Sequence, residues 1–342
     1  MIYDCFTFFN ELDLLEIRLN VLNDVVDRFV LVEATKAHSG KDKPLYFNDN
    51  KERYKAFQHK IIHIIVDDYP VCTSPWAYEN HQRNAILRGL TQAQSDDAIM
   101  ISDMDEIPRP DLVRNHAQTK TTVLFIQKLY YYFMNYLNVS NPDWPLGTKL
   151  FPYQYFLGDD SKIKAPYNEF LLPELNHGVT PTKMRFDENV MVIHNAGWHF
   201  SYLGGTEAII KKIQSTAHQE FNSAKNTDPK EILEQIRLGK DIFGRGDRFF
   251  GVPIDEEYPQ YIRENQEKFQ HLIFSVTPDY IRETWLVRRY YSCRGSLYRF
   301  IIFRVIPRSL HPLLIRIRNL LWFGRTSVPR PNVETTPSNK PL

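Results

Sequence analysis

The stretch Ala98-Ile99-Met100-Ile101-Ser102-Asp103-Met104-Asp105 joins a short apolar run to two acidic residues. An apolar run of this length that ends in polar residues is typical of a buried β-strand. On an extended backbone, side chains two residues apart point the same way, so the Asp103 and Asp105 carboxylates can face one cation. Hard ions such as Mg²⁺ and Mn²⁺ prefer oxygen ligands. The stretch therefore predicts a strand that carries an acid pair to a divalent metal.

Strands and helices alternate on the N-terminal side of this stretch. Apolar and β-branched runs predict strands over residues 2–8, 29–32 and 60–66. Leucines at helical spacing predict a helix that starts at Asn10-Glu11, and a second helix is expected over 78–90. This alternation predicts an α/β fold with a mostly parallel, Rossmann-like sheet that is flanked by helices.

Polar residues follow the predicted strands at the edge where α/β proteins bind ligands. Asn10 and Glu11 follow the first strand, Glu33 follows the second, and the acid pair follows the fourth. Two simpler interpretations stay open at this point. Asn10 can cap the first helix, and a lone Asp-x-Asp is also common in solvated turns. The position of the acid pair at the end of a buried strand favours a ligand site.

The rest of the chain is expected to continue the same domain to residue 281. Further strands are predicted over 123–126, 130–136, 149–156 and 190–194, and helices over 207–221 and 229–238. From residue 282 arginines recur, which predicts a basic amphipathic helical extension over 282–325. Residues 326–342 are rich in Pro, Ser, Thr and Asn, a composition typical of a disordered tail.

Composition and charge exclude several classes of protein. The net charge is +1, whereas proteins that track nucleic-acid phosphates carry a large basic excess, so no nucleic-acid partner is expected. The three cysteines are far apart and odd in number, which argues against a disulfide framework. Neither a signal peptide nor an apolar run of membrane-spanning length is visible. We therefore expect a cytoplasmic protein.

Several motifs in a fixed order carry a resemblance to a known family. They are Phe9-Asn10-Glu11-Leu12-Asp13-Leu14-Leu15, Asp24-Val25-Val26-Asp27, Val30-Leu31-Val32-Glu33, Asp103-Met104-Asp105-Glu106-Ile107-Pro108 and His194-Asn195-Ala196-Gly197-Trp198-His199-Phe200-Ser201. Together they resemble glycosyltransferase family 17, the β-1,4-mannosyl-glycoprotein β-1,4-N-acetylglucosaminyltransferase family. The resemblance covers roughly residues 1–275.

This resemblance implies a fold, a reaction and a donor. The fold would be GT-A-like, and the enzyme would invert the anomeric centre while it transfers N-acetylglucosamine from UDP-N-acetylglucosamine in β linkage. The acceptor would be a glycan or a lipid-linked saccharide. An inverting transfer needs a group that takes the proton of the acceptor hydroxyl. It also needs positive charge, from Mn²⁺ or Mg²⁺ and nearby cations, on the departing diphosphate.

Candidate residues follow from these needs. We assign Asp105 as a direct metal ligand and Asp103 as its partner, through the metal or the ribose. His199 is a candidate third ligand or acceptor contact, and Trp198 can stack on a sugar. Glu207 is the candidate base with Asp241 in reserve, and Glu106 can orient the acid pair. The donor-binding candidates are Asn10, Glu11, Glu33, Arg83, Asp103, Lys240 and Arg245.

Each of these candidates also has a simpler interpretation. His199 and Trp198 can be core residues, and Glu106 can be a surface carboxylate. Glu207 can merely complement a helix dipole. For the whole chain, the alternatives are a transferase with another donor sugar, a metal-dependent nucleotidyltransferase, or a sugar-binding protein that is not an enzyme. A nucleotidyltransferase should show a Gly-rich phosphate loop with a Lys near the first strand, and the sequence has none.

The basic extension adds one expected partner. Within residues 313–321, leucines and isoleucines fall on one helical face, while Arg316 and Arg318 lie off it. Such a pattern is typical of helices that lie on a membrane surface. We therefore expect residues 282–325 to bind an anionic membrane, which places the protein at its inner face. Packing of these helices on the catalytic domain is the alternative.

Overall fold

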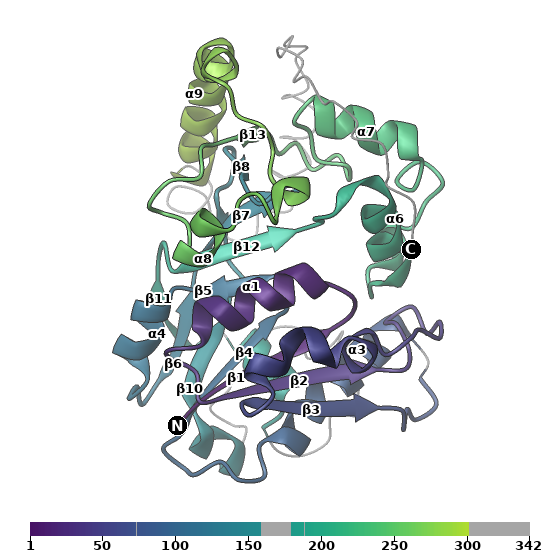
Figure 1. Cartoon of the computed structure of the whole chain (residues 1–342), viewed down its shortest axis with the longest axis vertical. Coiled ribbons are helices and arrows are strands. Elements are labelled where there is room, and N and C mark those ends of the chain that lie inside the picture. Colours follow the sequence, from purple (N-terminus) through teal and green to yellow (C-terminus); the bar gives the residue numbers. More distant parts are fainter. Residues whose placement is uncertain (73, 159–178, 188, 301–342) are drawn as a thin grey trace.

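The structure is a computed structural model that describes residues 1–72, 74–158, 179–187 and 189–300. Within these residues one sheet has seven strands in the order β11-β6-β10-β4-β1-β2-β3. Its strands are β1 (Ile2–Phe8), β2 (Arg28–Ala34), β3 (Ile61–Val66), β4 (Ala98–Asp103), β6 (Thr122–Phe125), β10 (Lys149–Pro152) and β11 (Val190–Ile193). In Figure 1 this sheet occupies the lower part of the molecule.

Parallel pairing dominates this sheet. Strand β1 pairs in parallel with both β2 and β4, and β2 pairs in parallel with β3. Strand β10 is antiparallel to β4 and to β6, whereas β11 is parallel to β6. The predicted α/β fold with a mostly parallel sheet is therefore confirmed. Its register aligns Thr7 with Asp103, so the end of β1 lies beside the acid pair.

Helices cover both faces of the parallel strands. Successive side chains of a strand point to opposite faces, so each strand places apolar residues against both layers of helices. Phe6, Leu31 and Met100 pack on the side of α1 (Leu12–Leu22). Val30 and Ile99 pack on the other side, against the 3-10 helix η2 (Ala85–Gly89), which follows α3 (Pro75–Asn84). Apolar burial on both faces explains why these strands are almost continuous hydrophobic runs.

A second sheet lies above α1 in Figure 1. In the described part of the chain it has the order β13-β8-β7-β12-β5, and β9 pairs with β7. The strands are β5 (Glu106–Pro108), β7 (Gln127–Tyr131), β8 (Tyr136–Asn138), β9 (Asp143–Trp144), β12 (Gly197–Ser201) and β13 (Phe249–Gly251). Isoleucines of α6 (Gly205–Ser215) and α7 (Pro229–Arg237) pack against its tyrosines.

The sequence reasoning was wrong about four elements. The strand predicted over 130–136 is interrupted, because Tyr132 has φ 70° and the chain turns there before β8. The strand predicted over 149–156 ends at Pro152, whose missing N–H cannot continue a ladder. The helix over 78–90 is instead α3 followed by η2, and Gly89 lies so close to Val30 that a Cβ would be 2.4 Å away. The helix over 207–221 ends at Ser215.

The remaining elements are short, apart from one long helix. They are α2 (Tyr46–Asp49), η1 (Lys51–Phe57), α4 (Pro110–His116), η3 (Tyr153–Leu157), α5 (Pro181–Phe186), η5 (Gln219–Phe221), α8 (Gln260–Glu264), η6 (Gln270–Leu272) and α9 (Pro278–Phe300). None of the described helices is both long and apolar enough to cross a membrane. The predictions for 301–325 and 326–342 lie outside the described residues, and the boundary at residue 282 stays a prediction.

Candidate active site

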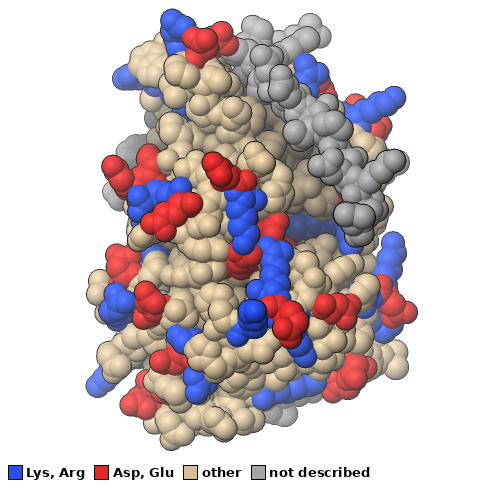
Figure 2. Space-filling view, in the orientation of Figure 1, with Lys and Arg blue, Asp and Glu red and all other residues tan. Residues whose placement is uncertain are grey.

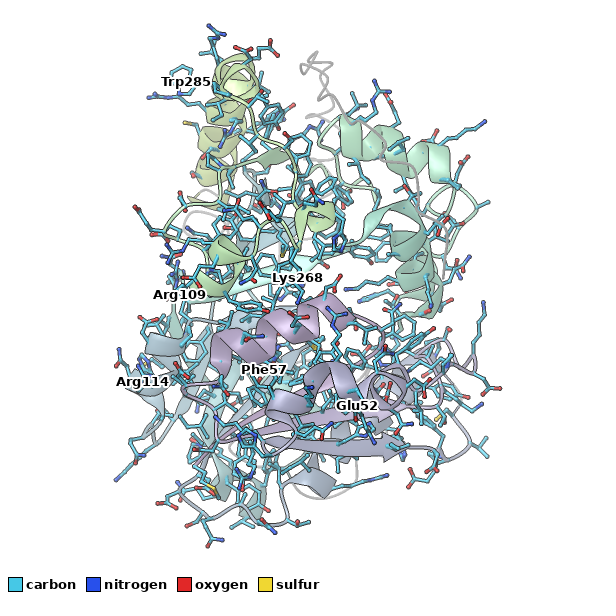
Figure 3. The ribbon with its side chains drawn as sticks, viewed as in Figure 1. Glu52, Phe57, Arg109, Arg114, Lys268 and Trp285 are labelled. Atoms are coloured by element: carbon cyan, nitrogen blue, oxygen red, sulfur yellow. The ribbon has the colours of Figure 1, made fainter. Side chains whose placement is uncertain are left out.

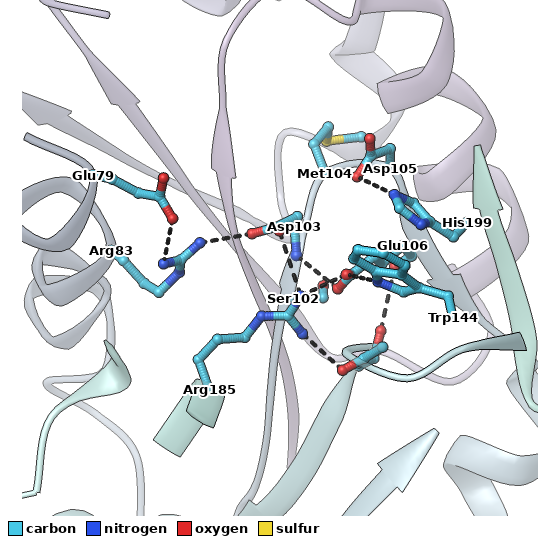
Figure 4. A network of polar contacts seen from close by, with 12 residues as sticks. Glu79, Arg83, Ser102, Asp103, Met104, Asp105, Glu106, Trp144, Arg185 and His199 are labelled. Atoms are coloured by element: carbon cyan, nitrogen blue, oxygen red, sulfur yellow. Dashed lines mark hydrogen bonds and ion pairs between the residues drawn. The ribbon is translucent and has the colours of Figure 1, made fainter. Parts of the chain in front are cut away.

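The acid pair lies in a turn that joins the two sheets. Strand β4 of the larger sheet ends at Asp103, and β5 of the second sheet begins at Glu106. The Asp103 side chain is 40% exposed, whereas that of Asp105 is only 9% exposed. The turn therefore presents one accessible and one enclosed carboxylate at the carboxyl end of a buried strand, where ligands bind in α/β proteins (Figure 4).

A fully buried arginine of α1 holds this turn in shape. Arg18 forms a two-point ion pair with Asp4 of β1, with N···O distances of 2.6 and 2.8 Å. Its Nη1 donates to three carbonyl oxygens of the turn, those of Asp103, Met104 and Glu106, at 2.8–3.2 Å. Because a guanidinium presents its donors in a rigid fork, Arg18 fixes the backbone that carries both carboxylates.

Three cations from three different helices contact the acid pair. Arg83 of α3 donates to Asp103 at 2.8 Å, and Arg185 of α5 lies 3.4 Å from the other Asp103 oxygen. Lys212 of α6 donates to Asp105 at 2.7 Å. Burial alone would raise the pKa of both carboxyl groups, but these cations lower it, and the pKa of Asp105 falls far below its usual range. Both acids are therefore ionised.

His199 and Trp144 form the wall on the Asp105 side. The His199 Nε2 lies 3.4 Å from Asp105 Oδ1, and the two aromatic rings lie 4.4 Å apart (Figure 4). Among the described residues, His199 Nδ1 has no hydrogen-bond partner although it is buried. Gly197 permits this arrangement, because at φ 155° a Cβ there would lie 2.2 Å from the Ile107 carbonyl oxygen.

Glu106 is completely buried behind the acid pair, which rules out the surface-carboxylate interpretation. Its carboxylate accepts hydrogen bonds from Arg185 at 2.5 Å and from the Trp144 indole at 2.6 Å. It also accepts the Asp103 backbone N–H at 3.0 Å. Burial raises the pKa of Glu106, and Arg185 opposes that shift. These contacts suit the predicted orienting role, because they connect Glu106 to Asp103 itself and to Arg185, which contacts Asp103.

The side chains at the acid pair supply donor atoms of the kinds that bind a divalent cation. Two ionised carboxylates and an imidazole are suitable donors for Mn²⁺ or Mg²⁺. Yet across the described residues no three His, Cys, Asp or Glu side chains converge into a ready-made metal site. Mg²⁺ in particular is often bound by one or two carboxylates together with substrate phosphates.

The donor-binding candidates near the first two strands make different contacts. Glu33 is buried and accepts the backbone N–H groups of Phe47 and Asn48, with His63 at 3.2 Å. The Glu11 carboxylate accepts the N–H of Asn10 at 2.9 Å. Glu11, and not Asn10, is the N-cap residue of α1, so the simpler interpretation of Asn10 was wrong.

Asp241, Lys240 and Arg245 lie in a separate loop after α7. Arg245 holds Asp241 through both oxygens, at 2.7 and 3.1 Å, and also donates to the Tyr131 hydroxyl. Lys240 and Asp241 line a cavity of about 220 Å³ beside α7. Aromatic contacts connect this loop to the acid pair, because Tyr131 packs 4.9 Å from Tyr202, whose ring lies under Lys212.

Trp198 and Glu207 complete the set of predicted residues. Trp198 is 3% exposed, donates to the Glu257 carbonyl and packs under Arg109, which are the contacts of a core residue. Glu207 is exposed in the first turn of α6. It lies one turn before Lys211 on the same helical face, and Lys211 contacts the Tyr46 hydroxyl. The acceptor contact of Trp198 and the base role of Glu207 stay predictions.

The sequence reasoning missed Arg18, Arg185 and Lys212. Arg18 had a visible signal, because Asp4 is an acid inside an apolar strand and needs a buried cation. Arg185 and Lys212 had none, because each reaches the acid pair from a helix that lies about 80 to 110 residues further along the chain.

Comparisons with known proteins agree with the resemblance in the sequence. The sequence model described as glycosyltransferase family 17 matches residues 1–155. The β-1,4-mannosyl-glycoprotein 4-β-N-acetylglucosaminyltransferases of Rattus norvegicus and Homo sapiens are each 24% identical over 292 residues, which is 77% of this chain. The chain spans about half the length of these relatives, 53% in each case.

Solved structures give a weaker likeness. A mannosyltransferase from Pyrobaculum calidifontis in complex with GDP-Man and Mn²⁺ has a TM-score of 0.36 and 10% identity, over 94% of this chain and 80% of that one. An active-site mutant of LgtC has a TM-score of 0.31 and 11% identity, over 81% of this chain and 98% of that one. These scores are too low to support an argument about function. The resemblance to glycosyltransferase family 17 is confirmed over residues 1–155, where the family model matches.

Proposed function

We propose that this protein is a metal-dependent, inverting glycosyltransferase. It transfers a sugar, N-acetylglucosamine from UDP-N-acetylglucosamine, to a glycan or lipid-linked saccharide in β linkage. The observation that carries this proposal is the ionised Asp103–Asp105 pair in a strand-end turn that three cations surround. The family match and the names of the curated relatives support the choice of reaction and of donor sugar.

Asp103 and Asp105 would hold the divalent ion, with His199 as a candidate third ligand. The ion, when bound, supplies positive charge that stabilises the departing diphosphate. Among the described residues, the two ionised carboxylates and the His199 imidazole are the donor groups named at this turn. We therefore expect the ion to bind tightly only together with the donor, whose phosphate oxygens complete the shell.

The three cations at the acid pair have a second role in this proposal. In the structure, Arg83, Arg185 and Lys212 pair with the carboxylates directly. A diphosphate that binds at the turn competes with the carboxylates for the same guanidinium and ammonium groups. Guanidinium–phosphate hydrogen bonds are charge-assisted and often two-pronged, so the arginines are well suited to orient the leaving group. The donor then finds its cationic contacts already in place.

The catalytic base must be a carboxylate that is free to receive the proton of the acceptor hydroxyl. Asp241 is held through both oxygens by Arg245, whereas Glu207 is exposed on α6. We therefore assign the base role to Glu207. Glu207→Gln should lower kcat by about 10²-fold and leave donor affinity nearly unchanged. An equal loss of donor affinity, measured by calorimetry with UDP, would move Glu207 to the donor site.

The test of the proposal is the release of UDP from UDP-N-acetylglucosamine. Turnover with Mn²⁺ or Mg²⁺ should stop in a chelator, and Asp105→Asn should lower it by about 10³-fold, because a charge-stabilising group is lost in the transition state. Asp13→Asn, an acid on α1 that is also paired with cations, is the matched control and should keep full turnover. Full turnover in the chelator would contradict the metal assignment.

A further inference from the structure

Helix α9 has two faces of different character. One face packs on the body of the protein, where Thr284 and Tyr291 are buried and Tyr291 joins a small core cluster with Val139 and Phe250. At Gly295 the helix backbone comes so close that a Cβ would lie 1.9 Å from the Ser140 carbonyl oxygen. The helix is therefore docked firmly by this face, and its rotation about its own axis is fixed.

The opposite face is aromatic, apolar and exposed. Arg282, Trp285, Leu286, Arg289 and Tyr290 follow each other at spacings of three, one, three and one, which place them on one helical face. Trp285 is 51% exposed, Leu286 71% and Tyr290 52%. In Figure 3, Trp285 lies on the outer side of α9, away from the rest of the protein. Three large apolar side chains on one exposed face mark an interaction surface.

Arginine side chains lie beside the aromatic rings of this face. The Arg289 guanidinium lies 5.4 Å from the Trp285 ring centre, and Arg294 lies 5.6 Å from that of Tyr290. The acids beside them are Asp279, which pairs with Arg282, and Glu283. After Glu283 the chain has ten arginines and no acid until Glu334. Acidic and basic side chains are interspersed over the surface that Figure 2 shows.

We propose that the face of α9 formed by Arg282, Trp285, Leu286, Arg289 and Tyr290 docks on an anionic lipid bilayer. Indole and phenol rings suit the boundary between headgroups and acyl chains, because one end is apolar and the other polar. Arginines beside them attract anionic headgroups. A second copy of this chain is a poorer occupant, since it would bring arginines against arginines. The proposal goes beyond the transfer reaction and does not depend on it.

Flotation of the full chain with lipid vesicles tests this docking. The protein should float with vesicles of phosphatidylcholine and phosphatidylglycerol, and remain at the bottom with phosphatidylcholine alone. The triple variant Trp285→Ser, Leu286→Ser, Tyr290→Ser should lower the partition coefficient by at least about 100-fold, because three apolar side chains no longer insert. The matched control Val71→Ser, Leu157→Ser, Met191→Ser removes three exposed apolar side chains elsewhere and should float as before.

A second pair of variants separates charge from apolar insertion. Arg282→Gln with Arg289→Gln should lower the partition coefficient by about 30-fold on anionic vesicles, because each basic side chain contributes separately to the attraction. Thermal unfolding should show equal midpoints for all variants, since the changed side chains are exposed. The docking is wrong if the full chain does not float, or if the serine triple variant floats as well as the unchanged protein. A serine triple variant that only converts a dimer to a monomer would also overturn it, in favour of self-association.

Discussion

Two clusters in this protein each combine a pair of acids with several cations, but they have different surroundings. At the turn after β4, Asp103 and Asp105 contact two arginines and a lysine. On α1, Asp13 and Glu16 contact a different set, which consists of Arg53, Lys268, His271 and the Tyr261 hydroxyl. We call the second set the α1 cluster. Both clusters tie together segments that are far apart in the sequence.

The difference between them lies in where each is placed in the fold. The α1 cluster projects from the side of a helix and connects it to η1 and to the segment around η6, so its bonds serve packing. The acid pair sits at the carboxyl end of a buried parallel strand, with Arg18 fixing the backbone beneath it. A set of acids and cations is therefore not a site by composition alone. The strand-end position and the rigid support make one of the two clusters a candidate for chemistry.

The largest difference should appear when the arginine of each region is removed. Arg18→Met should lower the free energy of unfolding by about 3–5 kcal/mol, because it leaves Asp4 as an uncompensated buried charge. Arg53→Met should cost about 1 kcal/mol or less, since Arg53 is 31% exposed and its pairs are screened by solvent. Urea unfolding of the two variants measures this. Equal losses would mean that Arg18 is no more central to the fold than a surface arginine.

The strands that lead to the acid pair could be predicted well, because the signals for them are local in the sequence. The apolar runs of β1, β2, β3 and β4 each carry their own periodicity, and the acid pair follows its strand directly. The second sheet was not predicted, because its strands are short and pair across long separations, such as Trp198 of β12 with Lys128 of β7. For the same reason Arg185 and Lys212 were invisible as parts of the site. Their contacts depend on tertiary packing, which no short motif encodes.

A smaller effect should distinguish the lysines of the two clusters. Lys212 contacts Asp105 and Lys268 contacts Glu16, so each has one carboxylate partner at the edge of its cluster. Lys212→Gln should weaken UDP binding in the presence of Mg²⁺ by about 10-fold, because one charge-assisted contact to the diphosphate is lost. Lys268→Gln should leave UDP affinity unchanged. Calorimetry measures both, and equal affinities would exclude Lys212 from the donor site.

The smallest expected effect concerns the pH dependence of the α1 cluster. Burial opposes ionisation of Asp13 and Glu16, but Arg53, His271 and Lys268 outweigh it and lower the pKa of both carboxyl groups. A carboxyl group whose pKa is lowered by folding stabilises the protein above its unfolded pKa, about 4, and that contribution is lost as the pH falls through the folded value. Asp13→Asn should therefore reduce the free energy of unfolding by about 1 kcal/mol or less near neutral pH.

This stability difference between the unchanged protein and Asp13→Asn should shrink as the pH falls below about 4, the unfolded pKa. It should disappear once the pH lies below the lowered folded pKa of Asp13, where residue 13 is uncharged in both proteins. Urea unfolding at a series of pH values measures it. Asp96→Asn, at an exposed position, is the control and should show no such dependence. A difference that persists unchanged at the lowest pH would show that Asp13 stabilises α1 through packing or hydrogen bonding and not through its charge. Charge would then contribute less to the stability of the α1 cluster than its acids and cations indicate. The α1 cluster would differ even more from the ionised pair at the turn.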